Sequence, residues 1–143
     1  MIRKFRNNDF KTIMQIWLDT NIQTHTFISE NYWKDNFDTV KNMLPRAELY
    51  VYEDDYTNQI DGFIGLMGDY IAGIFIKEFA QSNGIGKQLL DYVKTLKSKL
   101  SLSVYQKNTR AIRFYQRESF VIQSENTDEN TKEKEFIMIW GEQ

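Results

Sequence analysis

The chain has 143 residues, of which 41% are hydrophobic, 15% aromatic and 27% charged, and its net charge is −2. This length and composition predict one folded domain over residues 1–143 and exclude a disordered chain, while the small net charge gives no indication of nucleic-acid binding. The absence of cysteine excludes disulfides, zinc–thiolate sites and an acyl-cysteine intermediate.

The N-terminal part of the chain predicts a strand followed by two helices. The strand is expected at residues 2–5, and apolar residues then recur at helical spacing from Phe10, where Asn8 or Asp9 can cap the helix. A connection at residues 20–29 leads to the second helix. Its expected first residue, last residue, cap and terminating residue are Glu30, Leu44, Ser29 and Pro45.

Three strand-like segments follow, at residues 47–53, 60–68 and 70–76. The third is nearly all apolar, so we expect it to be buried on both faces in the middle of a sheet. The most apolar stretch, residues 62–76, is interrupted by Asp69 and is too short to span a bilayer. Residues 1–10 lack the apolar core of a signal peptide. We therefore expect a cytoplasmic protein with no membrane contact.

Residues 81–90, QSNGIGKQLL, place two glycines and a lysine before an apolar helical repeat. The repeat consists of Ile85, Leu89, Tyr92, Val93, Leu96 and Leu100. The glycines therefore open a helix, where free backbone N–H groups and the helix dipole favour a phosphate group. Gln81, Gln88 and Leu89 occupy positions at which a P-loop or a dinucleotide fingerprint needs other residues. A glycine turn without a ligand remains the alternative for the two glycines alone.

The C-terminal part predicts a strand, a helix and two more strands, at residues 100–106, 108–118, 119–124 and 135–140, with a solvated polar loop at 124–135. The whole order is βααβββαβαββ. Such an order predicts an α/β fold with one mixed sheet and helices on its faces.

Two segments of the chain resemble the GNAT superfamily of acyl-CoA-dependent N-acyltransferases. Residues 81–86, Gln-Ser-Asn-Gly-Ile-Gly, are similar to the Gln/Arg-x-x-Gly-x-Gly/Ala loop of that family. The second segment, similar to Asn-x-x-Ala-x-x-Phe-Tyr followed by Gly-Phe, consists of Asn108, Ala111, Phe114, Tyr115 and Phe120. Ser119 stands where the family usually has glycine, which we interpret as a tolerated structural change.

The resemblance implies acetyl-CoA as co-substrate. No histidine cluster or paired-carboxylate motif stands out in the sequence, so no metal is expected. The pantetheine arm is then expected along the strand backbone at Ile74, Phe75 and Ile76. The expected positions around the pyrophosphate are Gln81, Asn83, Gly84, Ile85, Gly86 and Lys87. Lys87 has two equally good interpretations, a contact with the phosphate and an ordinary surface lysine. Asn108 is expected to cap its helix and also to contact coenzyme A.

Tyr115 is the expected general acid, because a tyrosine hydroxyl with a pKa near 10 can protonate a leaving thiolate at neutral pH. The alternative is an ordinary core tyrosine. The general base stays open among His25, Glu30, Tyr70 and Glu78. His25 lies in HTFI, which resembles a His-x-Phe-Ile/Leu stretch of small bacterial members, and its ordinary pKa suits acid–base work.

The predicted reaction is direct transfer of acetyl to a primary amine in a ternary complex. Phe27, Trp33 and Tyr70 are candidates to contact the acceptor, which is a small molecule or a peptide; packing in the core is the alternative for these aromatics. The protein is expected to be a monomer or a homodimer. A non-catalytic acyl-CoA-binding or sensory module on the same fold is the rival interpretation. A third, a degenerate fold that acts only as an interaction partner, predicts no coenzyme binding.

Overall fold

The computed structural model describes residues 1–142, and its elements follow the predicted order βααβββαβαββ. The strands are β1 (Ile2–Lys4), β2 (Glu48–Glu53), β3 (Ile60–Met67), β4 (Tyr70–Ile76), β5 (Lys99–Tyr105), β6 (Val121–Thr127) and β7 (Lys134–Gly141). The α-helices are α1 (Phe10–Thr24), α2 (Glu30–Met43), α3 (Ile85–Leu96) and α4 (Thr109–Arg117). The predicted α/β fold class is therefore confirmed.

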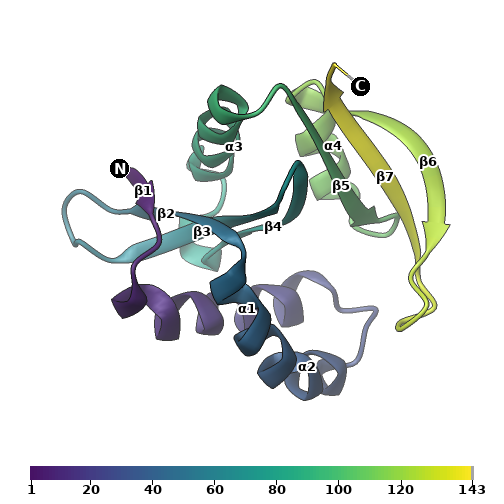
Figure 1. Cartoon of the computed structure of the whole chain (residues 1–143). Coiled ribbons are helices and arrows are strands. Elements are labelled where there is room, and N and C mark those ends of the chain that lie inside the picture. The colour runs from purple at the N-terminus through teal and green to yellow at the C-terminus, as the bar shows by residue number, and fades with distance from the viewer. Residues whose placement is uncertain (143) are drawn as a thin grey trace.

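The strands form one sheet in the order β1-β2-β3-β4-β5-β7-β6, in which only β4 and β5 are parallel (Figure 1). These two strands pair at just two positions, Tyr70 with Ser101 and Ile71 with Leu102. The next residue of β4, Ala72, is an extra residue in the register with β3. Such a bulge bends the strand that carries it, and beyond it β4 and β5 diverge, so that the sheet splits into two halves (Figure 1).

The expectation that residues 70–76 are buried on both faces is wrong. β4 is central in the sheet order, but only Ile71 is buried, and Ile74, Phe75 and Ile76 are partly exposed. The cause is the divergence from β5, which leaves the second half of β4 without a neighbour on that side. An apolar sequence thus identifies a central strand here without revealing that the strand borders an opening.

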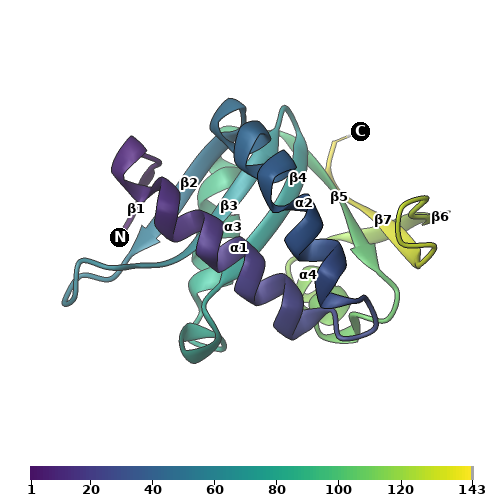
Figure 2. The ribbon, with the colours of Figure 1, turned by 90° about the horizontal axis from the view of Figure 1, so that it is seen from below.

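Helices cover both faces of the sheet. Figure 2 shows α1 and α2 side by side across one face, and α3 lies on the other. Each helix pair encloses its own apolar cluster. Trp17, Trp33 and Phe63 belong to the cluster under α1 and α2, whereas Leu89 and Tyr115 belong to the one that contains α3 and α4.

Several helix ends follow the predicted capping residues. The Ser29 hydroxyl accepts from the N–H of Asn31 at the start of α2, and a 3-10 turn containing Pro45 follows its end. Asp9, in contrast, makes no side-chain cap on α1. Its carboxylate accepts from the Arg6 N–H and forms an ion pair with Arg3 at 2.8 Å, which ties the helix to β1.

Several predicted boundaries differ from the structure, two of them by three residues or more. Helix α3 ends at Leu96, and Leu100 lies in β5 although its spacing matches the helical repeat. Strand β6 continues to Thr127, through residues that we expected to form a loop. Their side chains are exposed because β6 is an edge strand, and an exposed strand lacks the alternating pattern that marks a half-buried one.

Candidate active site

A cavity of about 780 Å³ lies where β4 and β5 separate. Its wall is built from the second half of β4, the loop and first turn of α3, the end of β5, and one side of α4 along its whole length. At its other end it reaches α1, α2 and the β6–β7 hairpin. Two segments far apart in sequence, the glycine loop and the connection after α1, thereby border one continuous space.

The glycine loop has the backbone conformation of an anion-binding turn. Gly84 has φ +79° and is followed directly by α3, so a left-handed residue precedes right-handed ones. Consecutive N–H groups in this arrangement converge on an anion, and the helix N-terminus adds its dipole. Ser82 is also left-handed, with φ +66°, which is unusual for a residue with a Cβ.

Gly86 does not serve the packing of the protein. A Cβ at this position would lie 3.4 Å from the Phe114 ring, an ordinary contact, and Gly86 is not among the glycines with positive φ. A glycine that neither conformation nor packing requires indicates that another group approaches the backbone. Gly84 differs in that its left-handed conformation itself favours glycine.

The second half of β4 offers an unpaired strand edge to the cavity. Ile74, Phe75 and Ile76 line the space, and the side chain of Gln81 donates to the Ile76 carbonyl at 3.0 Å. Gln81 therefore holds the glycine loop against the end of the strand. An extended group can bind along such an edge through main-chain hydrogen bonds, as an added strand does.

Helix α4 brings two predicted residues to the cavity. The Asn108 side chain accepts from the Ala111 N–H at 3.2 Å, which confirms its capping role. Tyr115 is buried between Phe114 and Phe120, yet it lines the cavity. Its hydroxyl has no hydrogen-bond partner within residues 1–142, and burial raises the pKa of Tyr115 above its ordinary value. The hydroxyl is thus protonated at neutral pH.

His25 ends α1 inside an aromatic cluster. Its ring stacks on Trp33 and meets Phe27 and Tyr105 edge to face. Burial lowers the pKa of His25 to about 4. Nδ1 lies 3.1 Å from the Asn21 Oδ1 atom, while the Asn21 amide nitrogen donates to the Trp17 carbonyl. Nδ1 therefore carries the hydrogen and Nε2 the lone pair.

Carboxylates gather at this end of the cavity. The Tyr105 hydroxyl donates to Asp128 at 2.7 Å, and Glu135 lies opposite Tyr105 in the β5–β7 register. Both carboxylates line the cavity. Burial opposes ionisation of Asp128, but hydrogen bonds from Tyr105 and from turn N–H groups outweigh it and keep the pKa of Asp128 below its ordinary value.

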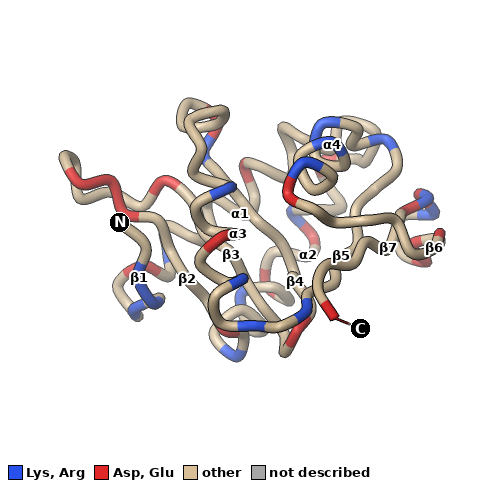
Figure 3. The backbone as a smooth tube through the Cα atoms, turned by 90° about the horizontal axis from the view of Figure 1, so that it is seen from above, with Lys and Arg blue, Asp and Glu red and all other residues tan. Residues whose placement is uncertain are grey.

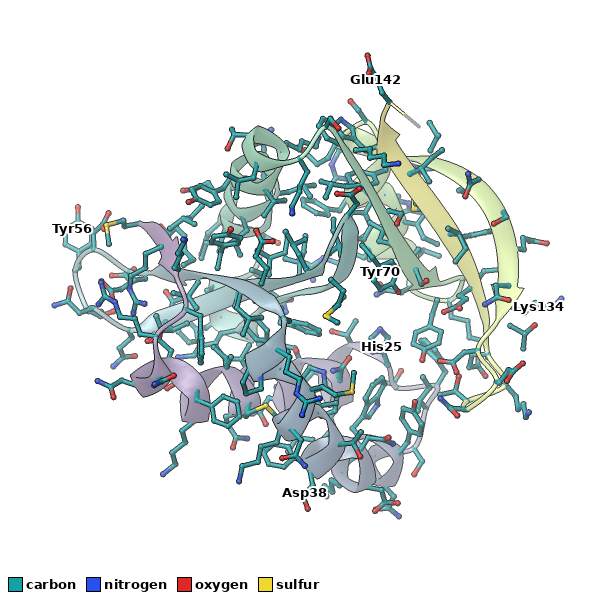
Figure 4. All side chains as sticks on the ribbon, viewed as in Figure 1. His25, Asp38, Tyr56, Tyr70, Lys134 and Glu142 are labelled. Atoms are coloured by element: carbon teal, nitrogen blue, oxygen red, sulfur yellow. The ribbon has the colours of Figure 1, made fainter. Side chains whose placement is uncertain are left out.

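Not every predicted residue reaches the cavity. Tyr70 and Trp33 line it, and Figure 4 shows Tyr70 and His25 near the divergence of the sheet. Glu30 is exposed and forms an ion pair with Lys34. The Phe27 ring contacts the His25 ring edge to face. The lining does not include the catalytic candidate Glu30 or the acceptor candidate Phe27. Of the predicted cofactor positions, it lacks Asn83 and includes the others.

Residues 45–122 match the family model described as "Acetyltransferase (GNAT) domain". The chain belongs to the GNAT acetyltransferase family. It is 36% identical over 142 residues to the peptidyl-lysine N-acetyltransferase YiaC of Escherichia coli (strain K12), covering 98% of this chain and 96% of YiaC. This acetyltransferase thus matches its relative over nearly the full length of both chains.

Solved structures show the same fold. The solution structure of apo YjaB from Escherichia coli superposes with a TM-score of 0.86 at 25% identity, covering 99% of this GNAT chain and 98% of YjaB. An aminoglycoside 6′-N-acetyltransferase complexed with coenzyme A has a TM-score of 0.73 at 14% identity, with 98% and 96% covered. The present acetyltransferase uses acetyl-CoA. The cavity offers an anion-binding turn and a free strand edge.

Sequence reasoning missed several lining residues of this GNAT enzyme, chiefly Asn21, Ser103, Tyr105, Arg110, Asp128 and Glu135. The four-residue spacing of Asn21 and His25 on one helix was a usable signal. The pairing of Tyr105 with Asp128 depends on strand register, and no pattern in the sequence indicates it. Within residues 1–142, no helix is long and apolar enough to cross a membrane, and no cluster of three or more metal-ligating side chains is present.

Proposed function

We propose that this enzyme transfers acetyl from acetyl-CoA directly to the ε-amine of a lysine in a peptide or protein. The observation that supports the proposal is the single cavity that joins the glycine loop to the carboxylates Asp128 and Glu135. A phosphate-bearing donor fits one end, and an amine, which is cationic in solution, fits the other. The relative YiaC carries the name peptidyl-lysine N-acetyltransferase.

The donor is proposed to bind as the GNAT resemblance implies. Its pantetheine arm would lie along Ile74, Phe75 and Ile76, and its pyrophosphate on the N–H groups of the glycine loop. Its thioester would then lie between β4 and α4, near Tyr115. This order places the reacting carbonyl between the two charged ends of the cavity.

Tyr115 is proposed as the general acid. The lysine nitrogen forms a bond to the thioester carbonyl carbon, the carbon–sulfur bond breaks, and the Tyr115 hydroxyl gives its proton to the leaving thiolate. Burial raises the pKa of Tyr115, so its hydroxyl stays protonated until the thiolate forms. The proton lost by the amine passes to water, and a proton from water returns to the Tyr115 oxygen after the thiol leaves.

His25 is proposed to shape the acceptor end rather than to remove this proton. A base with a pKa of about 4 binds protons too weakly to deprotonate an ammonium group with a reference pKa near 10. His25 instead fixes the positions of Trp33 and Tyr105 through ring contacts. Glu30 is exposed, is absent from the cavity lining and has no role in this scheme.

Initial-rate kinetics with a lysine peptide test direct transfer. With acetyl-CoA varied at several fixed peptide concentrations, reciprocal plots that intersect would support a ternary complex. Parallel lines would contradict it, because they indicate an acetylated enzyme. Thiol release that needs acetyl-CoA but no amine would also contradict the proposal.

A further inference from the structure

Arg110 connects α4 to the glycine loop. It is the second residue of α4 and lines the cavity. Its Nη1 atom donates to the Gln81 Oε1 atom at 3.1 Å, and its Nη2 atom donates to the Ser82 Oγ atom at 2.7 Å. The guanidinium therefore lies beside the turn that precedes α3, and its hydrogen bonds fix two residues of that turn, Gln81 and Ser82.

The charge of Arg110 has no counter-charge among the residues that the structure describes. Both of its partners are neutral, and no ion pair of Arg110 occurs within residues 1–142. A guanidinium has five N–H donors, and these two bonds use only two of them. Helix α4 carries two more arginines, Arg113 and Arg117, and no acidic residue. Figure 3 shows blue segments at this helix.

Lys87, the cation of the loop itself, is in the opposite situation. Its ammonium group forms ion pairs with Asp91 at 3.2 Å and with Glu118 at 3.0 Å. Two carboxylates thus neutralise Lys87 and connect the start of α3 to the end of α4. A bound anion would have to compete with both.

We propose that Arg110 binds a phosphate group of coenzyme A and that Lys87 has a structural role. Guanidinium groups bind phosphate through paired N–H donors, and the bond is stronger when no other anion shares the charge. The proposal rests on the proposed placement of the donor along the glycine loop. Its ligand is either the 5′-diphosphate or the 3′-phosphate of the coenzyme, which have the same chemistry.

Calorimetric titration with coenzyme A tests this assignment. Arg110→Gln is expected to weaken binding by about 10- to 100-fold, the size of a lost charge-assisted hydrogen bond. Arg113→Gln removes an equal charge from the same helix, at an exposed position outside the cavity lining, and is the matched control; its affinity should stay within about twofold of the wild type. Lys87→Gln should weaken binding less than Arg110→Gln does. Thermal unfolding of each variant shows that the protein remains folded.

Two further arms separate the possibilities. If Arg110→Gln weakens 3′-dephospho-coenzyme A equally, the diphosphate is the ligand; if the loss disappears with this analogue, the 3′-phosphate is. Arg110→Lys, which keeps the charge, should bind more tightly than Arg110→Gln, and Arg110→Gln should show a smaller salt dependence than the wild type.

The inference is overturned if Arg110→Gln binds both ligands as the wild type does. It is also overturned if Arg110→Lys binds no better than Arg110→Gln and the salt dependence is unchanged, because Arg110 then acts only by holding Gln81 and Ser82. Failure of the wild-type protein itself to bind coenzyme A would instead contradict the donor site on which the inference rests.

Discussion

The Tyr105 hydroxyl and the Asp128 carboxylate meet at 2.7 Å across the acceptor end of the cavity. Tyr105 ends β5 and contacts the His25 ring, whereas Asp128 begins the turn between β6 and β7. The bond therefore joins the β6–β7 hairpin to β5. The ring contact between Tyr105 and His25 extends this link to the connection between α1 and α2. It also fixes a carboxylate in the wall that a lysine substrate would approach.

Asp128→Asn is expected to raise the KM for a lysine peptide with basic neighbours by about tenfold, because one charge–charge interaction is lost. The asparagine oxygen can still accept from the turn amides, and its amide nitrogen can donate to the Tyr105 oxygen, so the hairpin should keep its shape. Glu129→Gln is the matched control, since it removes the same charge one residue away at an exposed position outside the cavity. Equal KM values for both variants and the wild type would contradict a role of Asp128 in acceptor binding.

Tyr115→Phe tests the general acid. The substitution removes only a hydroxyl that has no hydrogen-bond partner in the described chain, so packing with Phe114 and Phe120 should persist. We expect kcat to fall by about 100-fold while the KM for acetyl-CoA changes by less than about threefold. Thiol release at saturating substrates measures kcat. An unchanged kcat would show that the thiolate leaves without help from Tyr115.

Gly86→Ala tests the approach of the donor to the loop. The added Cβ meets Phe114 at an ordinary 3.4 Å, so the variant should fold, and alanine favours the helix by about 0.5–1 kcal/mol. Binding of acetyl-CoA should nevertheless weaken by at least about tenfold, because the methyl group occupies the space of the phosphate. A variant that is as stable as the wild type and binds acetyl-CoA equally well would rule out the assignment of the loop.

His25 should make the protein less stable in mild acid. Its pKa is about 4 in the folded protein and 6.5 ordinarily, so the unfolded chain binds the proton more tightly between these values. The contribution of His25 to the free energy of unfolding is therefore fully present above pH 6.5. It decreases as the pH falls toward 4, by up to about 3 kcal/mol. In His25→Phe, which keeps an aromatic ring, the melting temperature should depend less on pH over this range. Parallel pH profiles for both proteins would contradict the burial of a neutral His25.

Ser119 occupies a backbone conformation that favours glycine. It follows α4 with φ +73°, and its N–H donates to the Gln116 carbonyl in the turn that ends the helix. Ser119→Gly should raise the free energy of unfolding by about 0.5–1 kcal/mol, because glycine adopts this conformation without steric cost. Ser119→Ala, which keeps the Cβ, should give no such gain in denaturant unfolding. A Ser119→Gly variant less stable than the wild type would show that the serine side chain stabilises the turn.

The order of elements was predictable because most of them bury an apolar face that repeats with the period of a helix or a strand. The turn that opens α3 and the cap of α4 were predictable too, since Gly84 and Asn108 act through local backbone geometry. The acceptor end was not. Asp128 reaches Tyr105 through strand pairing, and nothing in the polar segment around residue 128 indicates where it folds. The exposure of β4 arises from its divergence from β5, and the sequence of neither strand alone predicts that divergence.

The most direct test of the account uses one peptide that carries a free N-terminal amine and a single internal lysine between basic residues. The peptide is incubated with the enzyme and acetyl-CoA, and fragmentation mass spectrometry locates the acetyl group. We expect acetylation of the lysine ε-amine, with one thiol released per acetyl group transferred. Acetylation of the N-terminal amine alone, or no acetylation by an enzyme that binds acetyl-CoA, would contradict the proposed lysine acceptor.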